Sequence, residues 1–302
     1  AKKKDDIITR LNVLADSYEN WIQKKLVHDS KMDDAKFKKE IGDTVINKCI
    51  EALGRIRAGI QLLVEDDISF DAFCFMNRSM ILQRNIMNFS KKHGAGIECA
   101  FRDFVDPRNP SNNFGWRPFQ IAFILMNLKG IVDPEHDNRE VVDLLYFPTG
   151  GGKTEAYLGL MAFVIANRRL RADENDEYNR DGGVTAILRY TLRLLTTQQR
   201  DRITKMVLAA ELIRQKEYPK YGKEPISIGF WVGGTVTPNT FKELEEDPED
   251  PAKTRKARSK KNSIYKQLLT CPFCGKPLTE ENFYIDIPTK SVSIYCSDRK
   301  ST

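Results

Sequence analysis

Apolar residues recur every three to four positions through most of residues 5 to about 100, which is the spacing of amphipathic helices. Three stripes stand out, within residues 7–22, Asp43–Val64 and Phe70–Phe89. Because sequential amphipathic helices bury their apolar stripes against one another, we expect a helical domain over residues 1–105. Its predicted core positions are Ile7, Ile8, Leu11, Leu14, Tyr18, Trp21, Ile22, Ile46, Cys49, Ile50, Leu53, Ile56, Ile60, Leu63, Phe73, Met76, Met80 and Met87.

The pattern changes after Asp106–Gly115, a segment rich in Pro, Asn and Ser that is typical of a linker. Short apolar runs then alternate with helical patterns, and this alternation is typical of a parallel sheet covered by helices. We therefore predict an α/β fold in which a partial parallel sheet with covering helices occupies residues 106–240. The predicted strands are Val141–Phe147, Val184–Tyr190 and Ile226–Val232, and the predicted helices are Gln120–Leu128, Thr154–Leu170 and Leu195–Gln215.

Residues 241–268 carry opposite charges in adjacent blocks, acidic over Glu243–Asp250 and basic over Lys253–Lys261. Such blocks favour a solvated, mobile insertion, and the alternative is that the basic half touches a nucleic-acid backbone. Over the whole chain, 48 basic and 42 acidic residues give a net charge of +6, an excess that permits a nucleic-acid partner without singling one out.

Membrane association and secretion are not expected. The longest apolar run, near Val141–Phe147, is far too short to cross a bilayer. The first residues do not form a basic and apolar signal sequence, because a run of lysines leads into Asp5. We therefore expect a cytoplasmic protein without a membrane partner. Its 302 residues are enough for about two domains.

Residues 147–154 read Phe-Pro-Thr-Gly-Gly-Gly-Lys-Thr and lie between a predicted strand and a predicted helix, the context that a phosphate-binding loop requires. Glycines let the backbone amides turn inward around phosphate oxygens, and the helix N-terminus adds a favourable dipole. Lys153 would reach the β- and γ-phosphates of ATP, and the Thr154 hydroxyl would ligate Mg²⁺. The alternative is a glycine-rich turn followed by a chance Lys-Thr pair.

The loop departs from the strict form of the motif, because Phe147 stands where a glycine is usual. A Phe-Pro-Thr opening resembles motif I of the superfamily 2 helicases. Upstream, residues 116–120 read Trp-Arg-Pro-Phe-Gln and resemble the element whose glutamine pairs with adenine in that family, since an amide offers both a donor and an acceptor. The predicted nucleotide-binding residues are Gln120, Thr149, Gly150, Gly151, Gly152, Lys153, Thr154 and Glu155, with Lys153 and Thr154 catalytic.

Residues 191–198 follow the second predicted strand and resemble helicase motif Ia, which grips a nucleic-acid backbone, although Leu192 separates the threonine from the arginine. An arginine and hydroxyl groups suit phosphate contacts. The alternative is that Thr191 or Thr196 caps a helix. The predicted nucleic-acid-binding residues are Thr191, Arg193, Thr197 and, in a glycine step after the third predicted strand, Gly234.

Three cysteines near the end of the sequence suggest a metal site. Cys271 and Cys274 form a Cys-x-x-Cys knuckle that ends in Gly275, and Cys296 follows at nearly the distance of a second zinc-ribbon pair. Residues 269–302 are therefore predicted to be a partial zinc-ribbon module for a structural Zn²⁺, with a fourth ligand outside this sequence. The alternative is a redox-active cysteine pair. The other cysteines are typical of buried fillers.

Neither an acidic Asp-Glu motif after Val232 nor a second motor lobe is recognisable in the sequence. These parts supply the catalytic base and the arginine finger of phosphoryl-transfer motors. We therefore expect ATP hydrolysis in a complete protein, and nucleotide binding with very slow hydrolysis in this chain alone.

Several segments together resemble one group of motors, the superfamily 2 helicases of the DISARM anti-phage defence system. The resemblance implies a RecA-like motor lobe, ATP-driven DNA translocation with Mg²⁺, and DNA and a DrmB-type subunit as partners. Two alternatives stay open, a nucleotide- and nucleic-acid-binding module without turnover and a P-loop ATPase that acts on protein. The segments are 16–22, 75–80 with Gln83, 116–120, 147–158 and the cysteine knuckle.

Overall fold

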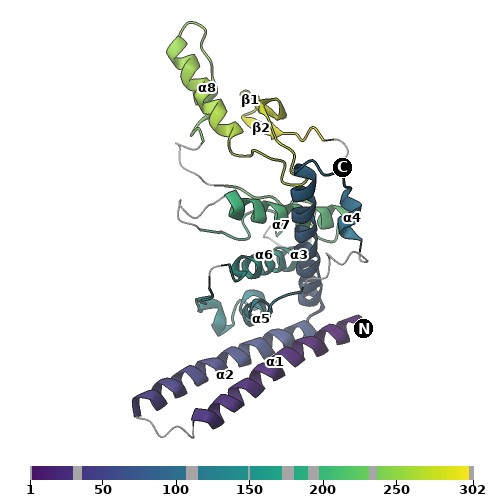
Figure 1. The fold of residues 1–302 in the computed structure, drawn as a ribbon, viewed down its shortest axis with the longest axis vertical. Coiled ribbons are helices and arrows are strands. Elements are labelled where there is room, and N and C mark those ends of the chain that lie inside the picture. The colour runs from purple at the N-terminus through teal and green to yellow at the C-terminus, as the bar shows by residue number, and fades with distance from the viewer. Residues whose placement is uncertain are drawn as a thin grey trace. The chain divides into compact units, whose positions relative to one another are not determined.

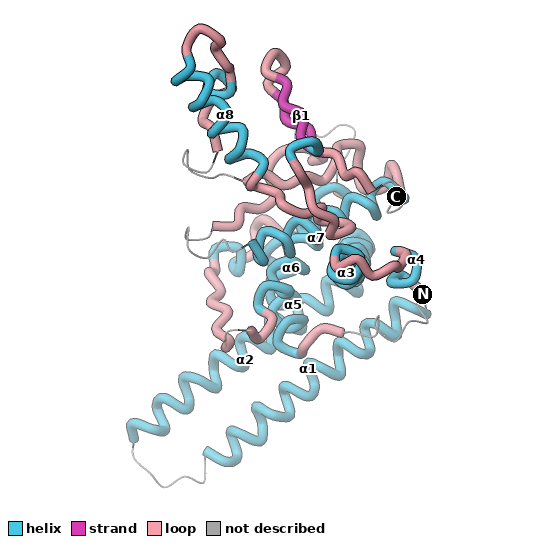
Figure 2. The backbone as a smooth tube through the Cα atoms, turned by 45° about the horizontal axis from the view of Figure 1, so that its top comes forward, coloured by secondary structure: helices cyan, strands magenta, loops and turns pink. Residues whose placement is uncertain are grey.

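The computed structural model describes residues 2–29, 36–106, 115–148, 150–171, 180–189, 197–230 and 237–298. Helices dominate these residues, and the only sheet among them is one antiparallel pair of strands (Figures 1 and 2). The α-helices are α1 (Lys2–Asp29), α2 (Lys36–Glu65), α3 (Asp67–Gly94), α4 (Phe101–Val105), α5 (Pro118–Val132), α6 (Lys153–Leu170), α7 (Thr197–Lys216) and α8 (Pro251–Tyr265). The 3-10 helices are η2 (Asp137–Glu140), η3 (Phe241–Leu244) and η4 (Glu280–Asn282), and the strands are β1 (Phe283–Asp286) and β2 (Ser291–Ile294).

The chain divides into two compact units, and each is assembled from three separate stretches of sequence. The first unit comprises residues 1–80, 114–189 and 213–224. The second comprises residues 81–113, 190–212 and 225–302.

The first unit contains a long helical hairpin, in which α1 and α2 run antiparallel side by side (Figure 1). The predicted helices of this region are confirmed, and so are most of their core positions. Trp21 and Ile50 are exceptions, because about half of each side chain is exposed. In the part of the chain that the structure describes, no helix is both long enough and apolar enough to cross a membrane. Buried positions of the hairpin are Leu11, Ala15, Ile22, Ile46, Leu53, Ile56, Ile60 and Leu63.

Helix α5 packs against α2 on one side and against α6 on another. Trp116 lies just before the N-cap of α5. Its indole Nε1 donates a 2.8 Å hydrogen bond to Oδ1 of Asn77 on α3. Asn77 in turn donates to the carbonyl oxygen of Phe73 at 2.8 Å. A buried indole N–H needs such a partner. The start of α5 is therefore held at a defined position on α3.

Arg169, near the end of α6, fastens two loops of the first unit to that helix. Its guanidinium donates to the carbonyl oxygens of Tyr221 (3.0 Å), Glu224 (2.6 Å) and Asp181 (3.0 Å). The side chain is only 8% exposed. A buried arginine is stable only when its donors are satisfied, and here backbone carbonyls satisfy several of them.

The predicted parallel RecA-like sheet is wrong for the residues that the structure describes. Val141–Phe147 runs as an extended segment without a β-ladder, as do the described parts of the other two predicted strands. A strand buried on both faces should hide its apolar side chains. Instead, Val142 is 94% exposed and Ile187 is 84% exposed. The apolar core of the first unit comes from helices packed on helices, and apolar side chains of its two extended segments are exposed.

An ion pair inside the first extended segment explains part of this outcome. Asp143 accepts two hydrogen bonds from Arg55 on α2, at 2.7 and 2.6 Å, and both side chains are largely buried. Since side chains alternate along an extended chain, Asp143 facing α2 turns its neighbours Val142 and Leu144 towards solvent. The ion pair of Asp143 therefore determines which side chains of this apolar segment face solvent.

The second unit contains the small sheet and the charged segment. Strands β1 and β2 pair antiparallel, with Phe283 opposite Ile294 and Asp286 opposite Ser291. The segment predicted to be a solvated insertion folds locally into η3 and α8, and Asp250 caps α8 by accepting from the backbone N–H groups of Ala252 and Lys253. Its acidic and basic halves pair with each other, in the bridges Lys260–Glu243, Arg258–Glu246, Lys261–Glu246 and Lys253–Asp247.

We expect Arg169→Ala to lower the free energy of unfolding by about 3 kcal/mol, because three buried carbonyl groups lose their donor. Urea unfolding followed by circular dichroism measures the change. Arg10→Ala is the matched control, since Arg10 is 78% exposed and pairs only with Asp6 one helical turn away. That control should cost less than about 0.5 kcal/mol. Equal unfolding midpoints for the two variants would contradict the role given to Arg169.

Candidate functional site

The glycine loop folds into a tight turn that leads directly into α6. The N–H of Gly151 donates to the carbonyl oxygen of Pro148 at 3.0 Å, and Gly150 takes a positive φ of 80°. Gly152 is the N-cap of α6, with φ 90° and ψ 29° in the left-handed region that other residues rarely adopt. The predicted helix over Thr154–Leu170 is confirmed and begins one residue earlier, at Lys153.

The Lys153 ammonium group folds back over this turn. It donates to the carbonyl oxygens of Phe147 and Pro148, the second at 3.5 Å. Both acceptors are uncharged backbone groups. The loop thus holds a cation beside the N-terminus of a helix of 18 residues, where the helix dipole favours negative charge. It follows an extended segment and not the end of a paired strand, which departs from the predicted context.

Two residues at the start of α5 hold the glycine loop in place. Gln120 donates through Nε2 to the carbonyl oxygen of Gly152 at 2.7 Å and accepts at Oε1 from the backbone N–H of Arg117 at 2.8 Å. Arg117 donates to the carbonyl oxygen of Gly151 at 2.6 Å. Gln120 is buried, and a β-carbon on Gly152 would lie 2.7 Å from its Nε2. The structure therefore brings Gln120 to the loop, as the motifs indicated. In this structure its amide hydrogen-bonds the loop backbone at Gly152.

Phe147, the residue that departs from the strict loop motif, has a packing role. Its ring stacks on that of Phe119 with the centroids 4.0 Å apart and the planes within 13°. Aromatic pairs in such geometry stabilise by about 1 kcal/mol beyond the area they bury. The contact fixes the first residue of the loop to the same α5 turn that supplies Arg117 and Gln120. Arg117 and Phe119 were missed as site residues because their role depends on a fold in which α5 meets the loop.

Several of the predicted site residues lie outside the described residues, namely Thr149, Thr191, Arg193 and Gly234. Thr197 is the first residue of α7. Thr154 and Glu155 lie in the first turn of α6, and a β-carbon on Gly152 would come within 3.4 Å of the Glu155 carboxylate.

A cavity of about 520 Å³ lies within the second unit. Lys91, Arg200 and Lys205 line it together with one acidic residue, Asp201, which pairs with Lys205 at 2.5 Å. Its wall also includes Cys271. Such a cavity suits an anion, and it could not be found from the sequence because its basic residues come from two helices that are distant in the chain.

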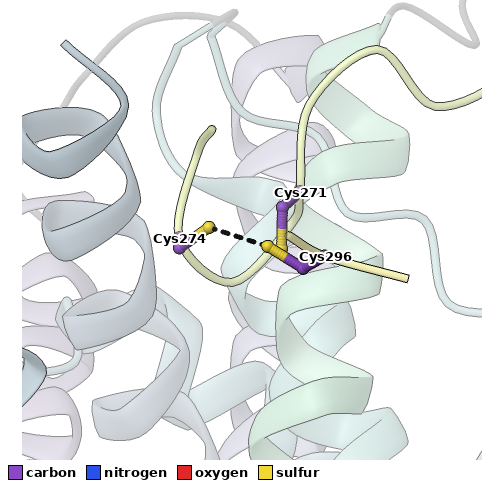
Figure 3. Close-up of side chains that lie close together, drawn as sticks. All are labelled: Cys271, Cys274 and Cys296. Carbon is purple, nitrogen blue, oxygen red and sulfur yellow. Dashed lines mark hydrogen bonds between the residues drawn. The ribbon is translucent and has the colours of Figure 1, made fainter. Parts of the chain in front are cut away.

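The three predicted zinc-binding cysteines do come together in the second unit (Figure 3). The sulfur atoms of Cys271, Cys274 and Cys296 all lie within 4.8 Å of one another, and those of Cys274 and Cys296 are 3.4 Å apart. The knuckle is a tight turn, in which the Gly275 N–H donates to the Cys271 carbonyl oxygen at 2.8 Å. Asn282 bonds the backbone of Tyr295 in both directions and thereby sets Cys296 beside the knuckle.

Burial raises the pKa of the Cys274 thiol to about 12 and also raises the pKa of the Cys271 thiol. Both are therefore protonated at neutral pH in the protein without metal. A nucleophilic redox pair needs a lowered thiol pKa, so this environment disfavours the redox alternative. A thiol that binds zinc releases its proton to solvent as the thiolate–metal bond forms, so a raised pKa does not exclude that role.

The cysteine knuckle packs against the last turns of α3. Phe273 packs against both Phe89 of α3 and Phe101 of α4, with ring centroids 5.6 and 4.9 Å away. The backbones of Gly94 and Gly275 touch, since a β-carbon on Gly275 would lie 3.1 Å from Cα of Gly94 and 2.0 Å from the Ser90 carbonyl oxygen. Sequence analysis missed this docking, because it joins residues far apart in the chain.

Two further polar side chains face the knuckle, and the motifs did not indicate either of them. His93 of α3 lies with Nδ1 2.9 Å from the carbonyl oxygen of Cys274 and with Nε2 3.1 Å from the carboxylate of Asp298. The ligand atoms of His93, Cys274 and Asp298 are within 4.8 Å of one another. The group is thus contiguous with the three cysteines through Cys274.

Together these features define a helical protein with a lysine-bearing glycine loop at a helix N-terminus and a cluster of cysteine, histidine and aspartate side chains of the kinds that ligate metals. No protein-family model matches the chain. Over 99% of its length, the chain is 44% identical to the DISARM protein DrmA of Bacillus paralicheniformis, and it spans 26% of that protein's length. The resemblance to a protein of the DISARM defence system, which the motifs indicated, is confirmed by this match.

The contact between Gly152 and Gln120 can be tested with a matched pair of glycine variants. Gly150→Ala and Gly152→Ala both place a side chain at positive φ, which costs roughly 1 kcal/mol each. Only Gly152→Ala also meets Gln120, whereas a β-carbon on Gly150 has open space around it. We expect Gly152→Ala to be the less stable by about 1 kcal/mol in urea unfolding. Adding Gln120→Ala should reduce that difference, and an unchanged difference would contradict the contact.

Proposed function

We propose that residues 147–155 bind the triphosphate of ATP with Mg²⁺, and that the protein is an ATP-driven DNA helicase or translocase of DISARM anti-phage defence. The observation that carries the proposal is the start of α6. There, a left-handed Gly152 turns the chain so that Lys153 and Thr154 open a helix of 18 residues. The similarity to DrmA supports the biological setting.

Electrostatics favours phosphate at this loop. Among the described residues, the Lys153 ammonium group donates to two backbone carbonyl groups, those of Phe147 and Pro148. A phosphate oxygen carries a full negative charge, so a short swing of the side chain gains a charge-assisted bond. Backbone amides of the glycine turn and the α6 dipole act in the same direction. In this proposal, Lys153 binds the β- and γ-phosphates and Thr154 ligates Mg²⁺.

The Gln120 amide connects base recognition with the phosphate loop in this proposal. A glutamine amide has two donors and an acceptor oxygen with two lone pairs. Its hydrogen bonds to Gly152 and Arg117 use one donor and one lone pair. The adenine edge would engage the rest, so that binding the base and holding Gly152 become one event. The same side chain would then select the nucleotide and support its phosphate site.

Contact with DNA is proposed for Thr191, Arg193, Thr197 and Gly234. Supporting it, the first turns of α7 supply Arg200 and Lys205 to the basic cavity of the second unit. The net charge of +6 agrees with an anionic partner. A DrmB-type subunit is proposed as the protein partner, on the resemblance alone.

Binding of a fluorescent ATP analogue with Mg²⁺ to the chain tests the nucleotide site. We expect Lys153→Ala to raise Kd at least about tenfold, since a charged contact with phosphate is lost. Lys129→Ala is the control; this lysine lies at the far end of α5 beside Asp133, and its variant should bind as the unchanged chain does. Unaltered affinity in Lys153→Ala would overturn the proposal.

ATP hydrolysis by the full-length protein, with and without DNA, separates the motor from its alternatives. A motor predicts DNA-stimulated hydrolysis that Lys153→Ala abolishes. ATP binding without hydrolysis would favour the nucleotide- and nucleic-acid-binding module. Hydrolysis indifferent to DNA at both low and high salt would favour an ATPase that acts on protein, because backbone contacts to DNA weaken as salt rises.

A further inference from the structure

We propose that His93 of α3 is the fourth ligand of a tetrahedral zinc site whose other ligands are Cys271, Cys274 and Cys296. The ligand set is then complete within this chain, whereas the spacing of the cysteines alone pointed to a ligand outside it. Asp298 lies next to the site as a carboxylate neighbour. This inference concerns the second unit and does not depend on the proposed nucleotide site.

The sulfur positions are close to those of a metal-bound cluster. Zn–S bonds of about 2.3 Å at tetrahedral angles separate neighbouring sulfur atoms by about 3.8 Å. The Cys274 and Cys296 sulfur atoms are 3.4 Å apart, and all three sulfur atoms fall within 4.8 Å of one another (Figure 3). A shift of a few tenths of an ångström would bring the Cys274 and Cys296 sulfur atoms to the separation expected of two zinc ligands.

Because Nδ1 of His93 is hydrogen-bonded to the backbone, Nε2 is the ring nitrogen that can bind a metal. Nδ1 lies 2.9 Å from the carbonyl oxygen of Cys274, which can only accept, so a neutral ring carries its proton on Nδ1. Nε2 then presents a lone pair. Histidines that bind zinc characteristically donate their other N–H to a carbonyl or a carboxylate in this way, which fixes the tautomer and the ring direction.

The surroundings of His93 Nε2 favour a positive charge at this position. In that tautomer its lone pair faces a carboxylate oxygen of Asp298 at 3.1 Å, and two acceptors at this distance repel each other. Both side chains are largely buried, so solvent screens the repulsion poorly. A metal ion or a proton on Nε2 would resolve it.

Packing holds His93 at the knuckle. The contact between the backbones of Gly94 and Gly275 prevents α3 from sliding along the knuckle without a clash. The imidazole ring also lies 5.0 Å from the ring of Phe89, which packs against Phe273 in the knuckle turn. The position of the fourth ligand is thus set by apolar packing on either side of it.

Charge favours histidine over Asp298 as the direct ligand. Three thiolates and a neutral imidazole leave zinc with a net charge of −1, whereas three thiolates and a carboxylate leave −2. The more negative cluster is costlier to bury against the aromatic side chains around Cys274. Asp298 instead neighbours the cation, and its removal should weaken binding by about 10- to 100-fold without abolishing it.

Zinc affinity of the full chain, measured by competition with a chromophoric chelator, tests the proposal. We expect one zinc per chain and a loss of affinity of at least about 100-fold in His93→Ala. His93→Cys restores a ligand and should recover affinity to within about tenfold, as four-cysteine sites are common for zinc. His136→Ala is the matched control; this histidine lies in the first unit and accepts from Asn138, so its loss should leave zinc binding unchanged.

Cobalt substitution separates a ligand from a merely structural residue. The Co²⁺ complex should have tetrahedral visible bands, and its sulfur charge-transfer absorption should increase in His93→Cys as a fourth thiolate joins. The proposal is overturned if the chain binds no zinc, if His93→Ala binds it as tightly as the unchanged chain, or if folded His93→Cys fails to recover binding. Complete loss in Asp298→Asn with retention in His93→Ala would instead make the carboxylate the ligand.

Discussion

The left-handed backbone of Gly152 is the constraint on which the candidate nucleotide site depends. It turns the chain from an extended segment into α6 within one residue, so that Lys153 and Thr154 begin the helix. The turn is stable because Gln120 and Arg117 hold the carbonyl oxygens of Gly152 and Gly151. Without those bonds the loop would have to satisfy its own polar groups, and the lysine would lose its fixed position beside the helix N-terminus.

The second unit depends on a different interaction, which is the docking of a cysteine knuckle on α3. A small module with one pair of strands has little core of its own. Aromatic packing of Phe273 against Phe89 and Phe101, and the touching backbones of Gly94 and Gly275, supply what the strands do not. A metal bound by ligands from both segments would stabilise the same docking by a stronger bond. Packing and the proposed metal binding would therefore favour the same arrangement.

Most of the long helices were predictable from the sequence, because each carries its own periodic apolar stripe, whereas α8 formed in a segment expected to be a solvated insertion. The predicted Thr154–Leu170 and the stripes of the hairpin illustrate this. The predicted sheet failed for the opposite reason. A short apolar run becomes a strand only when partner strands bond to it, and the run Val141–Phe147 finds an arginine for Asp143 instead of a neighbouring strand. Its apolar side chains are exposed as a consequence.

By itself, the sequence determined which short segments are the candidates for chemistry: a glycine turn ending in Lys153 and Thr154, and a cysteine knuckle with Cys296 near it. Those signals are local, since a few adjacent residues suffice to form a turn with the right conformation. Only the tertiary structure decided which distant residues contact these two segments. It placed Gln120 and Arg117 on the loop, and it brought His93 to Cys274, although the two are 181 residues apart in the chain. Such contacts follow from how helices pack, and packing depends on many weak interactions summed over the whole unit.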